Sequence, residues 1–478
     1  MKFANSKLKF LLLVLILLIA ISTRLYKIDN SITEWFSWRQ SDTAAVGRFL
    51  QKNQFNLLKP KYYDLSNIQS GMENPEGLRM VEFPLYSAIF AGLHQQFKVL
   101  PIETWGRLVS LGFSILMIVA VFLLLAKEFG LSEAFFGSLF LAINPFAVYY
   151  SRTILPDMPA TAMAFLAVYF LYVFLKKGLR WLILSGVLMA LALLIKPTVI
   201  FFLLPAVYLL WRKESLIVSK FFYAGLFLAI ALIPLIWWRF YIRQFPEAIP
   251  VNQWLLTSVN TIDGLQSIFF RPAFFRWIFF ERISQLIMGG YLVFFLLLGT
   301  LFESKKNLKL HLVFAGAALA YLFTFQGGNV QHEYYQTLIL PALALLVGVG
   351  SGYYFKQKKS GYVLVRLMVI LLLFISSSLF SFYQVKDKYD EQPNLILIAD
   401  VVRSLTTAKD LIVTDSQGDT TLLYLSDRRG YPAPYRDLAD FKSQGAKFFV
   451  TQNLDYKNTL SDTADLVFEN DQVLIFKL

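Results

Sequence analysis

The sequence has no cysteine and only three histidines, His94, His311 and His332, in 478 residues. Without cysteine the chain can form neither disulfides nor thiolate metal sites, and three scattered histidines argue against a multi-histidine metal centre. Charged residues are also scarce at 16%, whereas 56% of the residues are hydrophobic and the mean hydropathy is +0.54. Soluble domains carry about 25% charged residues, so this composition argues against a soluble protein.

Long apolar runs are what the sequence has in abundance. Runs long enough to cross about 30 Å of hydrocarbon recur along the first 383 residues. They predict a polytopic α-helical membrane protein with about eleven transmembrane helices. The shorter apolar segment 83–100 is interpreted as a juxtamembrane or re-entrant helix inside a large first outer loop. The candidate spans are 9–23, 105–126, 133–150, 158–175, 181–195, 198–211, 221–241, 286–302, 310–326, 337–355 and 362–383.

The distribution of positive charge predicts the orientation of these spans. If the N-terminus is cytoplasmic, the inner segments together carry all of the net charge of +13, and the outer side is neutral in sum. This bias follows the positive-inside rule and explains the charge better than binding to nucleic acid does. The first helix also resembles a signal peptide ending at Ala20-Ile21-Ser22, but we favour a retained helix, because the later spans need it for their orientation. The basic inner residues are Lys2, Lys7, Lys9, Lys127, Lys176, Lys177, Arg180, Arg212, Lys213, Lys220, Lys305, Lys306, Lys309, Lys356, Lys358, Lys359 and Arg366.

The last part of the chain is polar and reads as a separate domain. We expect residues 1–383 to form the transmembrane domain and residues 384–478 a small extracytoplasmic α/β domain. Helices are predicted over 391–405 and 436–444, strands over 411–414 and 447–450, and a hairpin over 464–476 that turns at Asn470-Asp471.

Polar motifs gather in the loops that this topology places outside. Ionisable groups at membrane depth cost about 2.5–3.5 kcal/mol each, so they persist mainly where they line a cavity or meet a substrate. We therefore expect Asp42, Glu82 and Asp157 to converge on one outer cavity. The candidate site residues are Arg39, Gln40, Asp42, Glu82, Arg152, Asp157, Lys196, Arg271, His332, Glu333, Tyr334 and Tyr335.

Each of these residues also has an ordinary interpretation. Asp42 and Glu82 could be solvated loop charges, and Asp157 could cap the helix that follows it. Lys196 could extend to a lipid headgroup, and Arg271 could pair with lipid phosphate or, like Arg276, with Glu281. His332 and the two tyrosines could form an interfacial aromatic belt. Their common placement on one face favours the functional interpretation.

In their order along the chain, these motifs resemble those of the membrane-embedded C-type glycosyltransferases. The resemblance is strongest to the bacterial branch related to protein O-mannosyltransferases and to the lipid A aminoarabinose and galacturonic acid transferases. Its carriers are Trp38-Arg39-Gln40-Ser41-Asp42-Thr43, Glu82-Phe83-Pro84-Leu85-Tyr86, Arg152 with Pro156-Asp157, Lys196-Pro197, and His332-Glu333-Tyr334-Tyr335.

The resemblance implies a location in the bacterial plasma (inner) membrane and an inverting glycosyl transfer at its outer face. The implied donor is a polyprenyl monophosphate sugar, and the acceptor is a lipid, a glycan or a protein. A carboxylate would serve as the base and fixed cations would hold the leaving phosphate. Family members often carry an Asp-Glu pair in the first outer loop, whereas this stretch holds the single acid Asp42, so Glu82 is the other candidate base. No cofactor is required, and a divalent metal is neither implied nor excluded.

Two other classes share some of these features. A lipid-linked sugar flippase or other transporter has many helices too, but it would show internal repeats and polar groups near the membrane midplane. A polysaccharide polymerase or ligase uses lipid-linked sugars on the same face. The acid in the first outer loop and the polar C-terminal domain favour the transferase.

The predicted topology can be tested with reporter fusions. A reporter active only in the periplasm should be active when fused after Leu478 and inactive when fused after Lys213, because the charge bias places these two positions on opposite sides of the membrane. A cytoplasm-only reporter that is active after Leu478 would show that the helix count is wrong by one.

Overall fold

The computed structural model describes residues 2–478 except 252–253, 262, 302–308, 358–361 and 461–463. The inner-loop charges expected at Glu303, Lys305 and Lys306, and at Lys358 and Lys359, therefore lie outside the described residues. The chain divides into two compact units. Unit 1 comprises Met1–Ile28, Arg107–Trp238 and Asn252–Asp387, and unit 2 comprises Asp29–Gly106, Arg239–Val251 and Lys388–Leu478.

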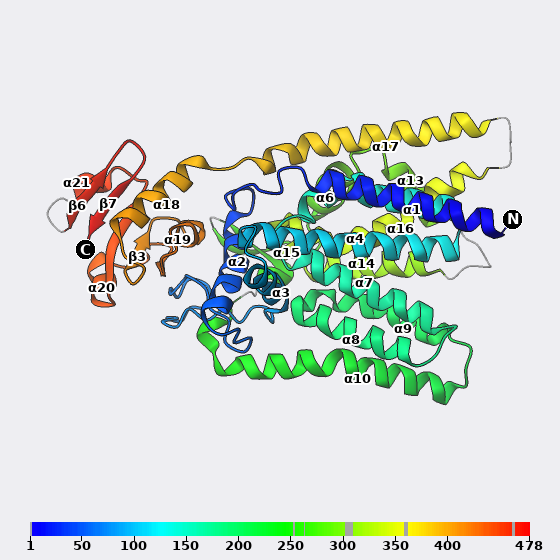
Figure 1. Ribbon diagram of the computed structural model, residues 1–478, viewed down its shortest axis with the longest axis horizontal. Helices are drawn as coiled ribbons and strands as arrows, with labels where there is room; N and C mark the ends of the chain where they lie inside the picture. The colour runs from blue at the N-terminus through cyan, green and yellow to red at the C-terminus, as the bar shows by residue number, and fades with distance from the viewer. Residues whose placement is uncertain (1, 252–253, 262, 302–308, 358–361, 461–463) are drawn as a thin grey trace. The chain divides into compact units, whose positions relative to one another are not determined.

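Unit 1 is built from apolar helices (Figure 1). In the described part of the chain, six helical stretches are long and apolar enough to cross a membrane, and four shorter apolar helices accompany them. The chain is thus a multi-pass membrane protein, while the count of eleven spans stays a prediction. The main helices are α1 (Lys2–Arg24), α4 (Ile102–Glu128), α5 (Leu131–Ile143), α6 (Pro145–Tyr150), α7 (Asp157–Phe174), α8 (Arg180–Ile195), α9 (Leu203–Arg212), α10 (Ile217–Tyr241), α13 (Val293–Leu301), α14 (Leu310–Thr324), α15 (Gln326–Gln331), α16 (Leu340–Phe355) and α17 (Val363–Val385).

Prolines break the helical backbone at two places, once inside the predicted span 133–150 and once between the predicted spans 181–195 and 198–211. A proline disfavours helical backbone at the residue before it and fits the first turn of a new helix. Asn144 is accordingly extended between α5 and α6, and its side chain accepts a hydrogen bond from the Ala147 amide at 3.0 Å. Lys196 is likewise extended between α8 and the 3₁₀ helix Pro197–Phe202. Both breaks leave a polar side chain where the helical direction changes.

The uninterrupted span predicted over 286–302 is wrong. A π-helical segment, Arg276–Ile287, is followed by Gly289 and Gly290 in left-handed backbone, and α13 begins only at Val293. A Cβ atom on Gly289 would lie 2.1 Å from the carbonyl oxygen of Ser377 on α17. The glycine pair therefore permits both the turn and the close approach of α17, which hydropathy alone does not reveal.

Loops predicted to share the inner side meet at one end of unit 1. Lys356, after α16, forms an ion pair of 2.7 Å with the buried Glu133 at the start of α5. Lys213, after α9, donates to the carbonyl of Leu175 at 3.2 Å, beside the predicted inner residues Lys176 and Lys177. These contacts agree with the predicted grouping of the inner loops.

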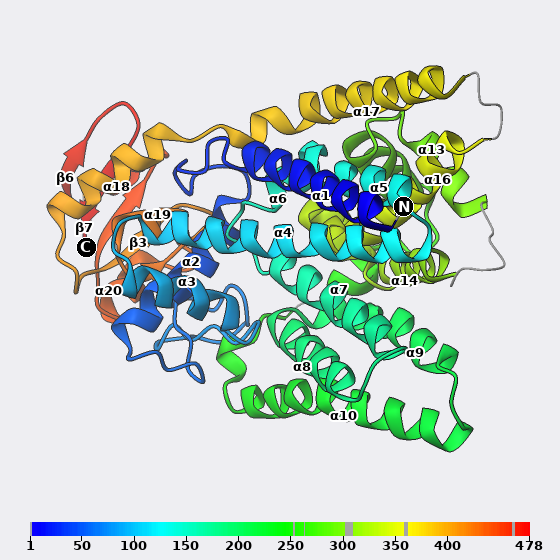
Figure 2. The ribbon, with the colours of Figure 1, turned by 45° about the vertical axis from the view of Figure 1, so that its right-hand side comes forward.

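Unit 2 contains a five-stranded sheet in the order β4-β3-β5-β7-β6. Figure 2 labels β3, β6 and β7 of this sheet. β3 pairs in parallel with β4 and β5, and β7 pairs antiparallel with β5 and β6. The predicted helices, strands and hairpin are all found, while β4, α19 and α21 were not predicted. The elements are α18 (Pro393–Leu405), β3 (Leu411–Thr414), α19 (Thr421–Ser426), β4 (Gly430–Tyr431), α20 (Leu438–Ser443), β5 (Ala446–Thr451), α21 (Tyr456–Leu460), β6 (Asp465–Glu469) and β7 (Leu474–Lys477).

The predicted first outer loop, about residues 24–104, lies from Asp29 on in the same compact unit as this sheet. It contributes α2 (Ser37–Lys52) and α3 (Leu85–Gln96), the latter within the segment predicted to be juxtamembrane or re-entrant. The amide of Leu65 donates a hydrogen bond to the Gly430 carbonyl at 2.9 Å, and the Gly430 amide donates one to the Tyr63 carbonyl at 3.0 Å. Leu65 also packs in the core of the sheet with Val413 and Phe449. Compactness thus groups the loop with the C-terminal residues, and the predicted boundary at 383/384 stays a prediction.

Candidate functional site

Asp42, the first candidate base, is fully buried on α2 and contacted at both oxygens. Arg79 Nη2 lies 3.0 Å from Asp42 Oδ2, and Thr420 Oγ1 donates to Asp42 Oδ1 at 2.7 Å. Arg79 compensates the cost of burying the carboxylate. A carboxylate has about four lone-pair sites, so two partners leave it capacity to accept a proton.

Glu82, the second candidate base, forms an ion pair with the predicted substrate-binding residue Arg39. The Glu82 side chain is 17% exposed, whereas that of Asp42 is 0% exposed. Gln40 is buried, and its amide donates to the Trp35 carbonyl at 3.1 Å. Both candidate bases of the first outer loop are therefore paired with an arginine, and Glu82 is the more accessible one.

Neither Arg79 nor the groups that hold it were predicted from the sequence. Its guanidinium donates to Gln69 Oε1 at 3.0 Å and lies 5.0 Å from the centre of the Tyr62 ring. The Tyr62 hydroxyl in turn donates to Asp64 at 3.3 Å. Burial raises the pKa of Asp64 to about 6 despite hydrogen bonds from Ser66, and the charge of Asp42 adds to the rise.

A second cluster of predicted residues lies in unit 1 around Lys196. Lys196 Nζ forms an ion pair of 2.6 Å with Asp157 at the start of α7, and both side chains are buried. The same ammonium lies 4.3 Å from the ring centre of Tyr335 and 5.4 Å from that of Tyr334. His332 stacks on Tyr334 at 5.3 Å. The structure thus brings these five residues together in one cationic and aromatic cluster.

The remaining predicted residues of unit 1 have other surroundings. Glu333 is buried and accepts hydrogen bonds from the Tyr150 hydroxyl and from Arg282. Arg152 is buried, donates to the Lys27 carbonyl and lies 5.8 Å from the ring centre of Tyr149. Arg271 is exposed at the start of α12 (Pro272–Phe275). Glu333 and Arg152 are therefore buried and have partners within the protein, whereas Arg271 is exposed, and the predicted substrate-binding roles of all three stay predictions.

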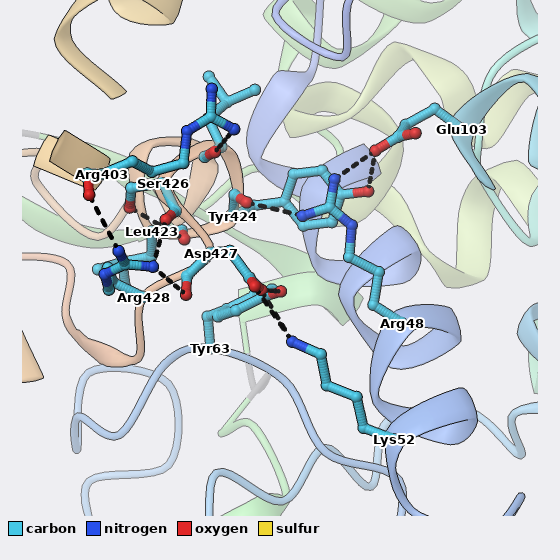
Figure 3. A network of polar contacts seen from close by, with 11 residues as sticks. Arg48, Lys52, Tyr63, Glu103, Arg403, Leu423, Tyr424, Ser426, Asp427 and Arg428 are labelled. Atoms are coloured by element: carbon cyan, nitrogen blue, oxygen red, sulfur yellow. Dashed lines mark hydrogen bonds and ion pairs between the residues drawn. The ribbon is translucent and has the colours of Figure 1, made fainter. Parts of the chain in front are cut away.

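A third network, in unit 2, was not anticipated from the sequence (Figure 3). Arg48 on α2 donates to Glu103 at 2.6 Å and to the Tyr424 carbonyl at 2.9 Å, and its guanidinium stacks on the Tyr424 ring at 3.7 Å. Lys52, one helical turn further along α2, forms an ion pair of 3.0 Å with Asp427. Asp427 also accepts a hydrogen bond from the Tyr63 hydroxyl. The seven- and four-residue spacing of Ser41, Arg48 and Lys52 was the available signal of a common helix face.

The expected convergence of Asp42 and Glu82 with Asp157 involves both compact units and stays a prediction. Within the described residues, no group of three or more histidine, cysteine or acidic side chains could hold a metal ion. Metal dependence likewise stays open to experiment.

Comparisons with known proteins bear on the fold. A model of the family described as dolichyl-phosphate-mannose-protein mannosyltransferase matches residues 84–238, about a third of the chain. No curated protein matches the sequence. Two solved structures of ArnT from Cupriavidus metallidurans align over 97% of both chains: the apo form with a TM-score of 0.67 at 13% identity, and the form bound to undecaprenyl phosphate with 0.66 at 16%. The oligosaccharyltransferase AglB from Archaeoglobus fulgidus, solved with an inhibitory peptide and a dolichol-phosphate, aligns with a TM-score of 0.61 at 12% identity, over 94% of this chain and 70% of that chain.

These matches define the class of fold. The chain has the fold of the membrane-embedded C-type glycosyltransferases, which confirms the resemblance seen in its motifs. Among the solved structures, it is similar to ArnT along nearly the whole length of both chains.

The raised pKa of Asp64 predicts a pH-dependent cost in stability. A carboxyl whose pKa is higher in the folded state destabilises the fold above that pKa, and the cost disappears as the pH falls through about 6 toward 4. Asp64→Asn should therefore raise the melting temperature of the purified protein at pH 8, through a gain of about 1–3 kcal/mol. The asparagine keeps the acceptor oxygen for the Ser66 amide. At pH 4 the two proteins should melt at nearly the same temperature, and an equal gain at both pH values would rule out this origin.

Proposed function

We propose that the protein is an inverting glycosyltransferase that acts at the outer face of the plasma membrane. It moves a sugar from a polyprenyl monophosphate to a lipid, glycan or protein acceptor. The observation that carries the proposal is the match, over 97% of both chains, to a structure solved with undecaprenyl phosphate. Two ion-paired carboxylates in the first outer loop, of which Asp42 is buried, and a buried lysine in an aromatic cluster supply the two kinds of group that the reaction needs.

The reaction exchanges one bond at C1 of the sugar. The acceptor hydroxyl attacks C1 from the side opposite the phosphate, and its proton passes to a carboxylate. The C1–O bond to phosphate breaks, and the polyprenyl phosphate leaves with the electron pair. Attack from the opposite side inverts the anomeric carbon. We assign the role of base to Asp42 and keep Glu82 as the alternative. Both are candidates because each is a carboxylate of the same loop that an arginine holds in place.

The leaving phosphate requires fixed positive charge. Lys196 is the central candidate because two tyrosine rings and Asp157 hold its ammonium in place. A group positioned in advance stabilises developing charge without reorganising during the reaction. Arg271 is the accessible second cation, and His332 and Tyr335 supply hydrogen-bonding groups near Lys196. With lysine and arginine in these roles, the proposal requires no metal.

Amide substitutions separate the two candidate bases. Asp42→Asn keeps the size of the side chain and an acceptor oxygen for Thr420 but loses the proton acceptor, so transfer should fall by about 10²–10⁴-fold. Transfer by the Glu82→Gln variant should fall by much less. The measurement is transfer of radiolabelled sugar in membranes that contain equal amounts of folded protein.

Asp410→Asn is the matched control for these substitutions. It removes another ion-paired carboxylate of unit 2, 2.7 Å from Lys447, and should leave transfer unchanged. If Glu82→Gln abolishes transfer while Asp42→Asn retains it, the two roles are exchanged.

A charge-neutral double variant tests the phosphate site. Lys196→Met alone would leave Asp157 buried without its partner, at a cost of about 3–5 kcal/mol. Lys196→Met/Asp157→Asn removes both charges and should fold, but it should raise the KM for the polyprenyl phosphate sugar at least about tenfold. KM is measured by varying the donor concentration.

The control is the ion pair at the opposite end of unit 1. Lys356→Met/Glu133→Gln removes a pair with a similar distance, 2.7 Å, without touching the proposed site. Equal KM values for the two double variants would contradict the assignment of Lys196.

A further inference from the structure

The short helix α19 of the C-terminal segment packs along one face of α2. Ser41, Arg48 and Lys52 share this face because residues three, four or seven apart lie on the same side of a helix. Ser41 Oγ lies 3.5 Å from Thr421 Oγ1, Arg48 donates to the Tyr424 carbonyl, and Lys52 pairs with Asp427. The segment 419–427 therefore contacts α2 over about three helical turns.

Charge and burial make this contact specific. Tyr424 is fully buried, its ring lies under the Arg48 guanidinium, and its hydroxyl donates to Glu103. Figure 3 shows Arg48, Tyr424 and Glu103 joined in one continuous set of hydrogen bonds. A shift of α19 along α2 would separate buried polar groups from their partners, which is costly in a water-poor interior.

Thr420, the residue before α19, is the point at which this contact reaches the proposed base. Thr420 is buried, and its hydroxyl donates to Asp42 Oδ1 at 2.7 Å. The backbone of the next residue is held as well, since the Thr421 amide donates to Asp419 Oδ1 at 2.7 Å. Arg79 contacts the other carboxylate oxygen, Oδ2. Asp42 is thus oriented from two sides, by the first outer loop and by the C-terminal segment.

We infer that the C-terminal segment 419–427 is a fixed positioning element of the active site, and that Thr420 orients the carboxylate of Asp42. This inference rests on the proposed role of Asp42. It assigns the C-terminal residues a part in the chemistry through α2, in place of the cover or lid that a separate domain would suggest. In this role Thr420 acts through Asp42 and not on the substrate.

Two substitutions of Thr420 test the hydrogen bond. Thr420→Val removes the donor with little change in volume and should lower kcat by about 10- to 100-fold, the usual effect of losing a hydrogen bond to a charged group. The KM for the donor should stay within about twofold, because Thr420 contacts no donor group. Thr420→Ser restores the hydroxyl and should restore kcat.

Thr414→Val is the control for a buried threonine. Thr414 lies in β3, is fully buried in the same unit and has no hydrogen-bond partner for its hydroxyl among the described residues. This variant should keep kcat. If Thr420→Val and Thr414→Val have the same kcat, or if Thr420→Ser does not rescue, the positioning role is refuted.

A cross-link tests the packing independently of enzymatic activity. Because the chain has no cysteine, Ser41→Cys/Thr421→Cys creates the sole pair of thiols, at positions whose oxygens lie 3.5 Å apart. Mild oxidation should form an intramolecular disulfide in nearly all molecules. Failure to form it would refute the contact between α19 and α2, whether or not the protein transfers sugar.

The same variant distinguishes a fixed element from a lid. If the segment is fixed, transfer by the double-cysteine variant should be equal before and after reduction of the disulfide. If oxidation stops transfer and a reductant restores it, the segment must move during turnover and the inference is wrong. An active wild type with no disulfide in the variant refutes this inference alone. A disulfide without any transfer by the wild type refutes the proposed function, and with it the positioning role, while the contact between α19 and α2 stands.

Discussion

A charge can be buried in a protein of this composition only where another group compensates it. Removing a charge from water costs several kcal/mol even after relaxation, and an ion pair offsets that cost only with good geometry. The structure meets this constraint with the buried pairs of Asp42 with Arg79 and of Lys196 with Asp157, and the half-buried pair of Arg48 with Glu103 follows the same pattern. Each pair joins residues that are distant in sequence. The pairs that offset the cost of the charges therefore also help to determine how the chain folds around the candidate site.

The breaks between helices place these charges. The extended backbone at Lys196 exists because Pro197 disfavours a helix there, and it ends α8 with a charged side chain beside Asp157. The tyrosine pair that holds the ammonium follows another extended residue, His332, between α15 and a 3₁₀ helix. Irregular backbone within an apolar helical unit is tolerated where it is buried in protein or lines a cavity. The local geometry and the chemistry of the cluster therefore have the same origin.

Much of this could be predicted from the sequence, and the exceptions have physical causes. Hydropathy located the apolar segments, and short runs of apolar, β-branched and aromatic residues located β3 and β5, because both signals are local. The break at Gly289 depends on how closely α17 approaches, which no local pattern encodes. The partners of Asp42 were missed for the same reason: Thr420 lies 378 residues away, and Arg79 is one arginine among many until the loop folds. Motifs identified the carboxylates, whereas only tertiary contacts identify the groups that orient them.

The central claim is that the protein breaks the bond between a sugar and a polyprenyl phosphate. The most direct test incubates membranes that contain the protein with a panel of polyprenyl phosphates carrying different radiolabelled sugars. The account predicts that one of these sugars passes to a new acceptor with inverted anomeric configuration while free polyprenyl phosphate accumulates. Label that crosses sealed vesicles while still attached to its lipid, with no polyprenyl phosphate released, would contradict the account and identify a transporter instead.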